Sequence, residues 1–246
     1  MEVELKHKQA FIEALHNYVP SPEAVALLSQ MPLVILLSVT GGGRNTIINK
    51  LVQTGRYHFI LSDTTRPPKV RNGVLEQDGV QYHFRREEDV LADIQQGMYL
   101  EAELIHGQQV SGTSIRELVR ARDSGKVPIN EVDLGGTVQI AAAKPDTVFL
   151  FVVPPSFDEW MRRLKAREHM SDDELYNRLQ TAAVILRTVL ASDQFVFVVN
   201  DDLDEVVATV DEYVSGHQHD THNAAAKACT RSIYHELSNM LTDFKP

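Results

Sequence analysis

Residues 33–53 read LVILLSVTGGGRNTIINKLVQ, and their pattern predicts a strand, a loop and a helix. The first five residues are all apolar, which is typical of a strand buried on both faces of a parallel sheet. Small residues and glycines follow at 38–43, and the residues after them predict a helix over 45–53. The strand, the small-residue loop and the helix together predict one unit of an α/β fold.

The same alternation of apolar strands and helices continues along the chain. Strands are predicted at residues 58–61, 127–132, 148–153 and 195–199. Helices are predicted at residues 87–96, 114–124, 156–166 and 172–190. This order predicts an α/β fold with a mostly parallel core sheet flanked by helices.

The composition limits the classes of function that the chain can have. Its 246 residues carry a formal net charge of −10, which argues against a general nucleic-acid binder but leaves room for a local basic pocket. The single cysteine, Cys229, excludes an intramolecular disulfide and a cysteine-cluster metal site. No apolar run approaches the roughly 20 residues that cross a bilayer, and the first residues lack the apolar stretch of a secretory signal. We therefore expect a cytoplasmic protein with no membrane partner.

Helical segments are predicted at both ends of the chain. Ser21 followed by Pro22 is typical of an N-cap with proline at the first helical position. Apolar residues from Ala226 onward share one face of a C-terminal helix. The terminal helices either pack on their own domain, which is the simpler interpretation, or form a homodimer.

Between the predicted elements, residues 215–223 form a polar segment that is predicted to be a linker. A metal site is a weaker interpretation of its acidic and histidine residues, because nothing nearby would orient them. These residues are His217, His219, Asp220 and His222.

The loop at 38–43 has the composition of a phosphate cradle. Backbone N–H groups of a glycine-rich turn, with the N-terminus of the following helix, bind anions. The usual pattern is G-x-x-x-x-G-K-[ST], from which the chain departs at Ser38, Arg44 and Asn45. Ser38 is expected to restrict the loop, because a residue other than glycine disfavours a positive φ. The loop is either a flexible turn or a phosphate site, and the flanking strand and helix favour the phosphate site.

Further segments in the same order resemble the guanylate kinases. Residues 62–69 read SDTTRPPK and residues 78–84 read DGVQYHF, which is similar to the segment that holds the phosphate of GMP in that family. The resemblance runs in collinear order over residues 32–215. Its other matches are at residues 99–101, 107, 112–114, 131–136, 154–156, 163–167, 178–179 and 200–204.

The resemblance implies a site for an acceptor nucleotide. Glu101 would read guanine, because one carboxylate accepts hydrogen bonds from both the N1–H and the 2-amino group of that base. The phosphate would be held by Ser62, Arg66, Lys69 and Tyr82, and further base contacts would come from Thr113, Ser114 and Asp133. The plainer interpretations are a solvated Arg66 in a capped turn and a surface carboxylate at Glu101. Val110 and Ser111 replace a family tyrosine, so base specificity stays open.

The resemblance also implies a site for ATP. Arg163, Arg167 and Arg178 match the lid arginines and, with Arg44, would act on the transferring phosphoryl group. The plainer interpretation of the lid arginines is a basic helix face. Asn45 and Glu131 would bind Mg²⁺ through oxygen atoms. The implied ATP-binding residues are Thr40, Gly41, Gly42, Gly43, Arg44, Asn45, Thr46 and, for the adenine, Asn200.

The implied fold is the P-loop nucleoside-monophosphate-kinase fold. A guanylate-kinase-like domain would span residues 32–215, with a GMP-binding subdomain near 62–113 and a lid near 160–180. A helical extension over 1–31 would precede it, and a linker and helix over 216–246 would follow it. The implied activity is Mg²⁺-dependent phosphoryl transfer from ATP to GMP or dGMP. Two alternatives remain: a weak or inactive module that binds nucleotide or protein, which the altered loop favours, and a kinase for another nucleoside monophosphate.

Overall fold

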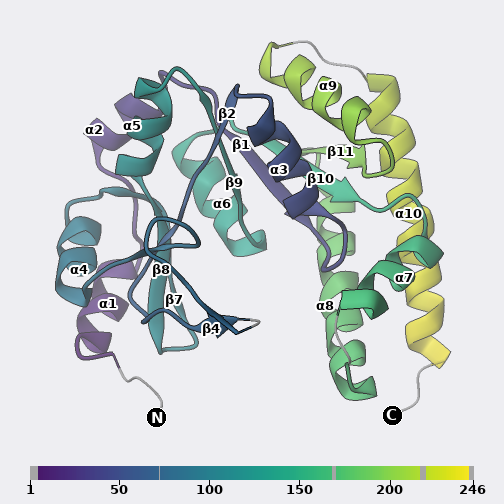
Figure 1. The fold of residues 1–246 in the computed structure, drawn as a ribbon, viewed down its shortest axis with the longest axis horizontal. Coiled ribbons are helices and arrows are strands. Elements are labelled where there is room, and N and C mark those ends of the chain that lie inside the picture. The colour runs from purple at the N-terminus through teal and green to yellow at the C-terminus, as the bar shows by residue number, and fades with distance from the viewer. Residues whose placement is uncertain (1–4, 72, 168–169, 217–219, 244–246) are drawn as a thin grey trace. The chain divides into compact units, whose positions relative to one another are not determined.

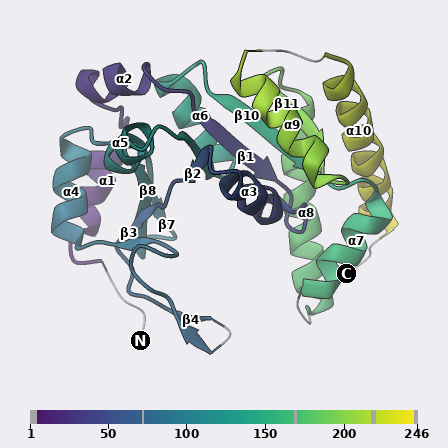
Figure 2. The ribbon, with the colours of Figure 1, turned by 45° about the horizontal axis from the view of Figure 1, so that its top comes forward.

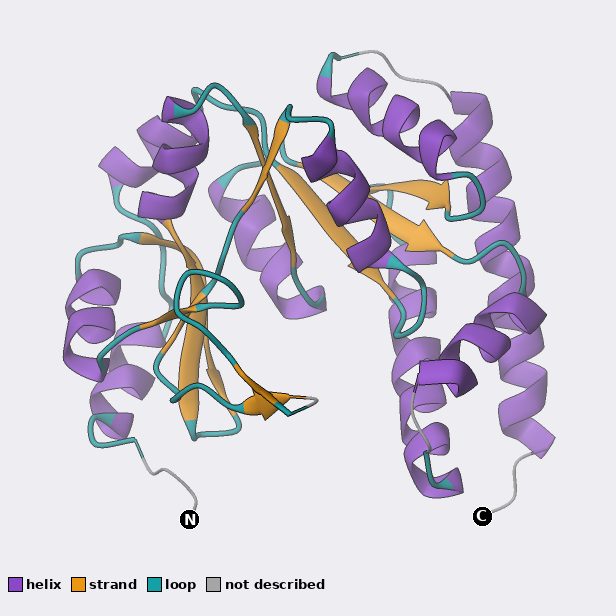
Figure 3. Cartoon of the chain, viewed as in Figure 1, coloured by secondary structure: helices purple, strands orange, loops and turns teal. Residues whose placement is uncertain are grey.

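A computed structural model describes residues 5–71, 73–167, 170–216 and 220–243 (Figure 1). Helices and strands alternate along the chain, as Figure 3 shows, which confirms the predicted α/β fold class. The chain divides into two compact units. The first unit comprises Met1–Leu33, Arg56–Asn130 and Gly135–Thr147, and the second comprises Val34–Gly55, Glu131–Leu134 and Val148–Pro246.

Parallel strands form the centre of the second unit. β1 (Val34–Ser38) pairs with β10 (Val148–Val153), which in turn pairs with β11 (Phe195–Val199). Every residue of β1 is buried. This burial confirms the prediction made from its apolar run, because a strand covered on both faces has no polar side to present to water.

Helices follow each strand of the second unit. α3 (Arg44–Gln53) follows β1, α7 (Phe157–Arg167) and α8 (Asp172–Leu190) follow β10, and α9 (Leu203–Val214) follows β11. Asp202 caps α9, because its side chain accepts hydrogen bonds from the N–H groups of Asp204 and Glu205 at 2.8 and 3.1 Å. The acidic run there is therefore a helix start. Lys50 of α3 pairs with Asp204 at 2.8 Å and so joins α3 to α9.

The C-terminal helix α10 (Asp220–Asp243) packs on its own unit. It contacts α7, α8 and β11, and Figure 1 shows it running alongside α8. Its buried face includes Ala226, Ile233 and Leu237. The side-chain oxygen of Asn223 accepts a hydrogen bond from the N–H of Phe197 in β11 at 2.9 Å. These contacts support the packing interpretation of the helix, and the homodimer stays a prediction.

The predicted linker at 215–223 is wrong in its last part, because α10 already begins at Asp220. Tertiary packing of α10 on α8 and β11 stabilises a helix that begins within a polar segment. His217 and His219 lie outside the described residues. Among the residues that are described, no group of three or more histidine, cysteine or acidic side chains is placed to bind a metal. No described helix is long and apolar enough to cross a membrane, and the cytoplasmic location stays a prediction.

The first unit contains two groups of strands. β2 (Tyr57–Phe59) pairs in parallel with β9 (Val127–Glu131). A separate sheet has the order β6-β3-β8-β7, formed by His83–Phe84, Asp63–Thr64, Gln109–Ser114 and Tyr99–Ile105. β4 (Val70–Arg71) and β5 (Val74–Leu75) form a hairpin that extends away from this sheet in Figure 2. The helices α4 (Glu87–Gln95), α5 (Ile115–Asp123) and α6 (Leu134–Ala143) lie in the same part of the chain.

The two N-terminal helices are part of the core of the first unit. α1 (Lys8–Leu15) contacts α4 and β7, and its Phe11 is fully buried in one hydrophobic cluster with Val90 and Tyr99. α2 (Pro22–Leu28) begins after Ser21, whose hydroxyl oxygen accepts a hydrogen bond from the N–H of Ala24 at 3.2 Å. The predicted cap is confirmed, and the N-terminal residues contribute apolar packing as well as helix.

Candidate active site

The glycine loop bends at its later residues rather than at its first. Ser38 is the last residue of β1 and is not among the residues with a positive φ, so the expected restriction of the loop is wrong. The strand continues through Ser38, and the left-handed positions are Gly41, with φ of +83°, and Gly43, with φ of +96°. The Ser38 hydroxyl donates a hydrogen bond to the carbonyl of Val152 at 2.7 Å and thereby fastens the end of β1 to β10.

Two side chains hold the loop backbone from outside. The indole N–H of Trp160 in α7 donates to the carbonyl of Thr40 at 2.8 Å. The side-chain amide of Asn200, which is 6% exposed, donates to the carbonyl of Gly42 at 3.0 Å. The predicted adenine residue Asn200 thus directs its amide at the loop. These bonds leave the loop preorganised, because its carbonyls are satisfied on one side.

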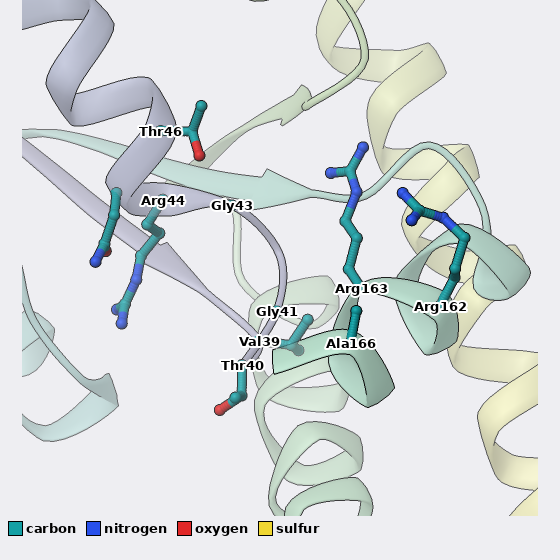
Figure 4. A pocket seen from close by; sticks show the side chains of 10 residues that line it. Val39, Thr40, Gly41, Gly43, Arg44, Thr46, Arg162, Arg163 and Ala166 are labelled. Carbon is teal, nitrogen blue, oxygen red and sulfur yellow. The ribbon is translucent and has the colours of Figure 1, made fainter. Parts of the chain in front are cut away.

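A cavity of about 360 Å³ lies against the loop (Figure 4). The N-terminus of α3 begins at the same place, so backbone N–H groups and the positive end of a helix border the cavity. Its surroundings are suited to a polyanion. The lining consists of Val39, Thr40, Gly41, Gly43, Arg44, Asn45 and Thr46 of the loop and α3, and of Arg162, Arg163 and Ala166 of α7.

Arg163 reaches the loop region from α7. Both of its terminal nitrogens donate to the backbone carbonyl of Asn200 at 3.3 Å, and its Nε donates to Glu159 at 2.7 Å. Arg162 also binds Glu159, at 2.6 Å. Hydrogen bonds from Arg162 and then from Arg163 lower the pKa of Glu159 to about 2. This carboxylate is therefore ionised at neutral pH and holds the two guanidinium groups on one side of the helix.

Arg44 turns away from the loop. Its Nε lies 3.1 Å from a carboxylate oxygen of Glu131, and one terminal nitrogen donates to the carbonyl of Val132 at 3.4 Å. Figure 4 shows the side chains of Arg44, at the start of α3, and Arg163, within α7, pointing in opposite directions. The structure thus pairs the predicted donor arginine with the predicted metal carboxylate. Sequence reasoning missed this pairing, because the two residues are far apart in the chain.

The other lid arginines belong to two helices, Arg178 to α8 and Arg167 to α7. A terminal nitrogen of Arg178 donates to Glu174 at 2.6 Å, one helical turn earlier. Arg178 and Glu174 also border a hollow of about 200 Å³ beside Thr40 of the loop. Arg178 is thus brought near the loop by α8. Arg167 ends α7, and its side chain lies outside the part of the structure that is described.

In the first unit, Arg66 is the centre of a buried polar cluster. Its side chain is 7% exposed and binds both carboxylate oxygens of Glu76, one of them at 3.0 Å. The Tyr82 ring lies 4.8 Å from the guanidinium carbon, and the Phe84 ring lies at 5.5 Å. The hydrogen bond that Arg66 donates to Glu76 is the main cause that raises the pKa of Arg66. Sequence reasoning missed Glu76. Its position between the predicted phosphate ligands Lys69 and Tyr82 could have indicated that an acidic residue pairs with a basic one there.

The remaining predicted phosphate ligands are less enclosed. Lys69 is exposed, and its backbone N–H donates to the Glu76 carboxylate at 2.9 Å. Ser62 and Tyr82 are half-buried. The structure therefore brings the Arg66 side chain and the Lys69 backbone together at Glu76, and it places the Tyr82 ring against Arg66.

Glu101 is oriented by a chain of hydrogen bonds. The Thr113 hydroxyl donates to a carboxylate oxygen of Glu101 at 2.7 Å, and the Asn130 amide donates to that hydroxyl at 2.9 Å. Glu101 on β7 and Thr113 on β8 lie opposite each other in the sheet. Ser114 is 1% exposed, whereas Asp133 is exposed and belongs to the second unit. Sequence reasoning missed Asn130, which lies within a strand and carries no motif signal.

Comparisons with known proteins connect these features to one family. The family model for guanylate kinase matches residues 30–217. A guanylate kinase of Sulfurimonas denitrificans is 33% identical over 180 residues, which cover 72% of this chain and 84% of that protein. A guanylate kinase of Desulfitobacterium hafniense is 36% identical over 172 residues, which cover 70% and 82%.

Two further comparisons concern a longer relative and the fold. Guanylate kinase 1 of Oryza sativa is 35% identical over 178 residues, covering 71% of this chain, and the chain spans less than half of that protein, 45%. A crystal structure of guanylate kinase from Anaplasma phagocytophilum aligns with a TM-score of 0.54 at 23% identity, over 87% of this chain and 97% of the other. This structural likeness concerns the fold. The family model and the bacterial relatives show that the chain belongs to the guanylate kinase family.

Proposed function

We propose that the chain transfers the terminal phosphoryl group of ATP to GMP or dGMP, which gives ADP and GDP or dGDP. The observation that carries the proposal is the orientation of Glu101 by Thr113 and Asn130. A carboxylate held in this way accepts hydrogen bonds from the two adjacent donors of guanine. Adenine presents no such pair, so the arrangement selects between the two purines.

The acceptor phosphate would be held by Arg66, Lys69 and Tyr82, with a hydroxyl contact from Ser62. A buried guanidinium group is suited to a phosphate dianion because its donors form a planar fork. Glu76 already occupies part of that fork. The phosphate then binds the remaining face of the cluster, where Lys69 supplies a second positive charge.

The donor phosphates would lie against the loop amides from Gly41 to Thr46. An oxygen of the acceptor phosphate attacks the γ-phosphorus, and the bond from that phosphorus to the oxygen of ADP breaks. Phosphoryl transfer depends on positioning and charge neutralisation, which Arg163, Arg178 and Arg167 would supply. Trp160 and Asn200 keep the loop in one conformation, so its amides need no rearrangement to meet the anion.

The donor set of this region also fits Mg²⁺. Asn45 and Thr46 border the cavity with an amide and a hydroxyl oxygen, and Glu131 carries a carboxylate. Hard oxygen ligands of this kind suit Mg²⁺, which neutralises charge on the phosphates when it is bound. Arg44 compensates the charge of Glu131 in the present structure. The altered residues Ser38, Arg44 and Asn45 are what favours an inactive module, whereas the orientation of Glu101 favours a kinase that acts on guanine nucleotides.

An ADP-release assay with ATP and Mg²⁺ tests the proposal. The acceptors are GMP, dGMP, AMP, UMP, CMP and dTMP, and the matched variant is Glu101→Gln, which keeps the shape of the side chain but replaces one acceptor oxygen by a donor. We expect turnover with GMP and dGMP, and a loss of at least about tenfold in kcat/KM for them in the variant. Absence of turnover with every acceptor in a folded sample would contradict the proposal.

A further inference from the structure

The residues before the family match make a contact with the strand that carries Glu101. The guanylate kinase model begins at residue 30, so α1, α2 and the turn between them lie outside it. Asn17, two residues after the end of α1, adopts the left-handed conformation, with φ of +56°. Asparagine tolerates this conformation better than most residues. The turn brings Tyr18 onto β7, where its side chain is half-buried.

The contact lies at an irregularity in the sheet. Tyr99 of β7 is opposite Ser114 of β8, whereas Glu101 is opposite Thr113, so two steps along β7 match one step along β8. This is the pattern of a β-bulge, which leaves an extra residue, Leu100, outside the regular ladder. A bulge leaves backbone groups in need of other partners.

Tyr18 supplies both partners at this position. Its hydroxyl accepts a hydrogen bond from the N–H of Tyr99 at 2.9 Å and donates one to the carbonyl of Tyr99 at 2.7 Å. One hydroxyl thus satisfies the donor and the acceptor of the same residue. Burial, and then the negative charge of Glu101, raise the pKa of Tyr18 to about 12 although the bond to the Tyr99 backbone opposes them. The hydroxyl therefore keeps the proton that it donates.

Tyr99 is also fixed through its own side chain. Its hydroxyl donates to Asp63 at 2.6 Å, and the same carboxylate oxygen accepts hydrogen bonds from Arg85 and Arg116 at 3.2 and 3.1 Å. The Tyr99 side chain is fully buried. The residue is consequently held at the backbone by Tyr18 and at the ring by a charged cluster.

The position of the bulge decides where Glu101 points. Side chains alternate between the two faces of a strand, so a shift of the bulge by one residue transfers the following side chains to the opposite face. Glu101 follows the bulge directly and meets Thr113 in the present register. A change in register therefore removes the carboxylate from the hydroxyl that orients it.

We propose that Tyr18 is a positioning residue for base selection, which holds the bulge at Leu100 in the register that presents Glu101 to guanine. This inference rests on the proposed function, because it assigns the base to Glu101. It extends the acceptor site to a segment that precedes the family match. The chemical class that it concerns is a purine nucleotide with donors at both N1 and the 2-position.

The test compares GMP with IMP, which lacks the 2-amino group and so makes one hydrogen bond fewer to a carboxylate. The variant is Tyr18→Phe, which removes the hydroxyl and keeps the ring. Ser21→Ala is the matched control, because it removes a helix cap in the same N-terminal segment without touching β7. Both nucleotides are titrated into each protein by calorimetry, and KM and kcat are measured with both.

We expect the preference for GMP over IMP to fall about tenfold in Tyr18→Phe, in the dissociation constants and in KM, with little change in kcat. The Tyr99 amide should exchange its hydrogen faster in this variant without nucleotide. Ser21→Ala should lower the melting temperature and leave the preference unchanged. An unchanged preference in folded Tyr18→Phe overturns the role of Tyr18 alone. Binding of neither nucleotide by the wild-type chain overturns the proposed function, and the selection role with it.

Discussion

Replacement of Gly43 by alanine should destabilise the second unit through two separate effects. Gly43 has a φ of +96°, where a side chain with a Cβ costs about 1–2 kcal/mol. A Cβ at this position would also overlap the side-chain amide nitrogen of Asn200 and lie 3.2 Å from its Cγ. The amide would have to move, and its buried hydrogen bond to Gly42 would be lost, which costs about 1–3 kcal/mol. The expected total is about 2–5 kcal/mol.

Gly55 offers a matched control in the same unit. It has a φ of +78°, and an added Cβ meets no described heavy atom within 4 Å. Gly55→Ala should therefore show the conformational cost alone, about 1–2 kcal/mol. The difference between the two variants then measures the overlap with Asn200.

Urea unfolding followed by tryptophan fluorescence measures these energies. The chain has one tryptophan, Trp160, whose indole N–H binds the loop, so its emission reports on the unit that contains both glycines. Asn200→Ala should also reduce the cost of Gly43→Ala, because the shorter side chain removes the obstacle. Equal losses of free energy in the two glycine variants, within about 0.5 kcal/mol, would rule out the overlap with Asn200.

Three further predictions follow from the packing and the charges. Phe11→Ala should lower the free energy of unfolding by about 3–5 kcal/mol in urea denaturation followed by circular dichroism, whereas Val19→Ala, at a residue 73% exposed, should change it by less than about 0.5 kcal/mol; similar losses would contradict the burial of α1. A double-mutant cycle of Arg44→Ala and Glu131→Ala should give a coupling energy of about 0.5–1 kcal/mol that falls with added salt, because both partners are partly exposed; zero coupling would exclude the pair. Burial alone would raise the pKa of Glu117, but His83 and Arg120 beside it hold that pKa below its usual range. A lowered folded pKa stabilises at neutral pH and loses its effect as the pH falls through it, so the stability difference between wild type and Glu117→Gln should shrink below about pH 4; a difference independent of pH would contradict this.

The parts of the fold that the sequence predicts are those governed by local pattern. The apolar run before the glycine loop predicts β1, because a strand covered on both faces cannot carry polar residues. The Ser21–Pro22 pair predicts the start of α2, because a cap acts on the next few residues. Local pattern does not predict α6, because Gly135 and Gly136 in its first turn are poor helix formers. Tertiary packing overrides this low propensity.

The details of the site depend on contacts between distant residues, which local pattern does not contain. Arg44 matches a phosphate-binding position by motif, but its ion pair with Glu131 joins residues on separate elements. The effect of Ser38 was mispredicted because a motif gives residue types and not the position where a strand ends. The bonds of Tyr18 to the bulge in β7 arise from packing of an N-terminal helix on a sheet.

The helix α10 has a consequence for the solubility of the chain. In the second unit β11 lies at the end of the strand order, and its outer side is where a further strand could add. On that side the Asn223 side chain accepts a hydrogen bond from the Phe197 N–H, and the apolar face of α10 covers the strand. The helix therefore prevents β11 from pairing with a strand of another chain. A chain shortened to end at Ser215 would expose a phenylalanine-rich edge and should assemble into heavier particles.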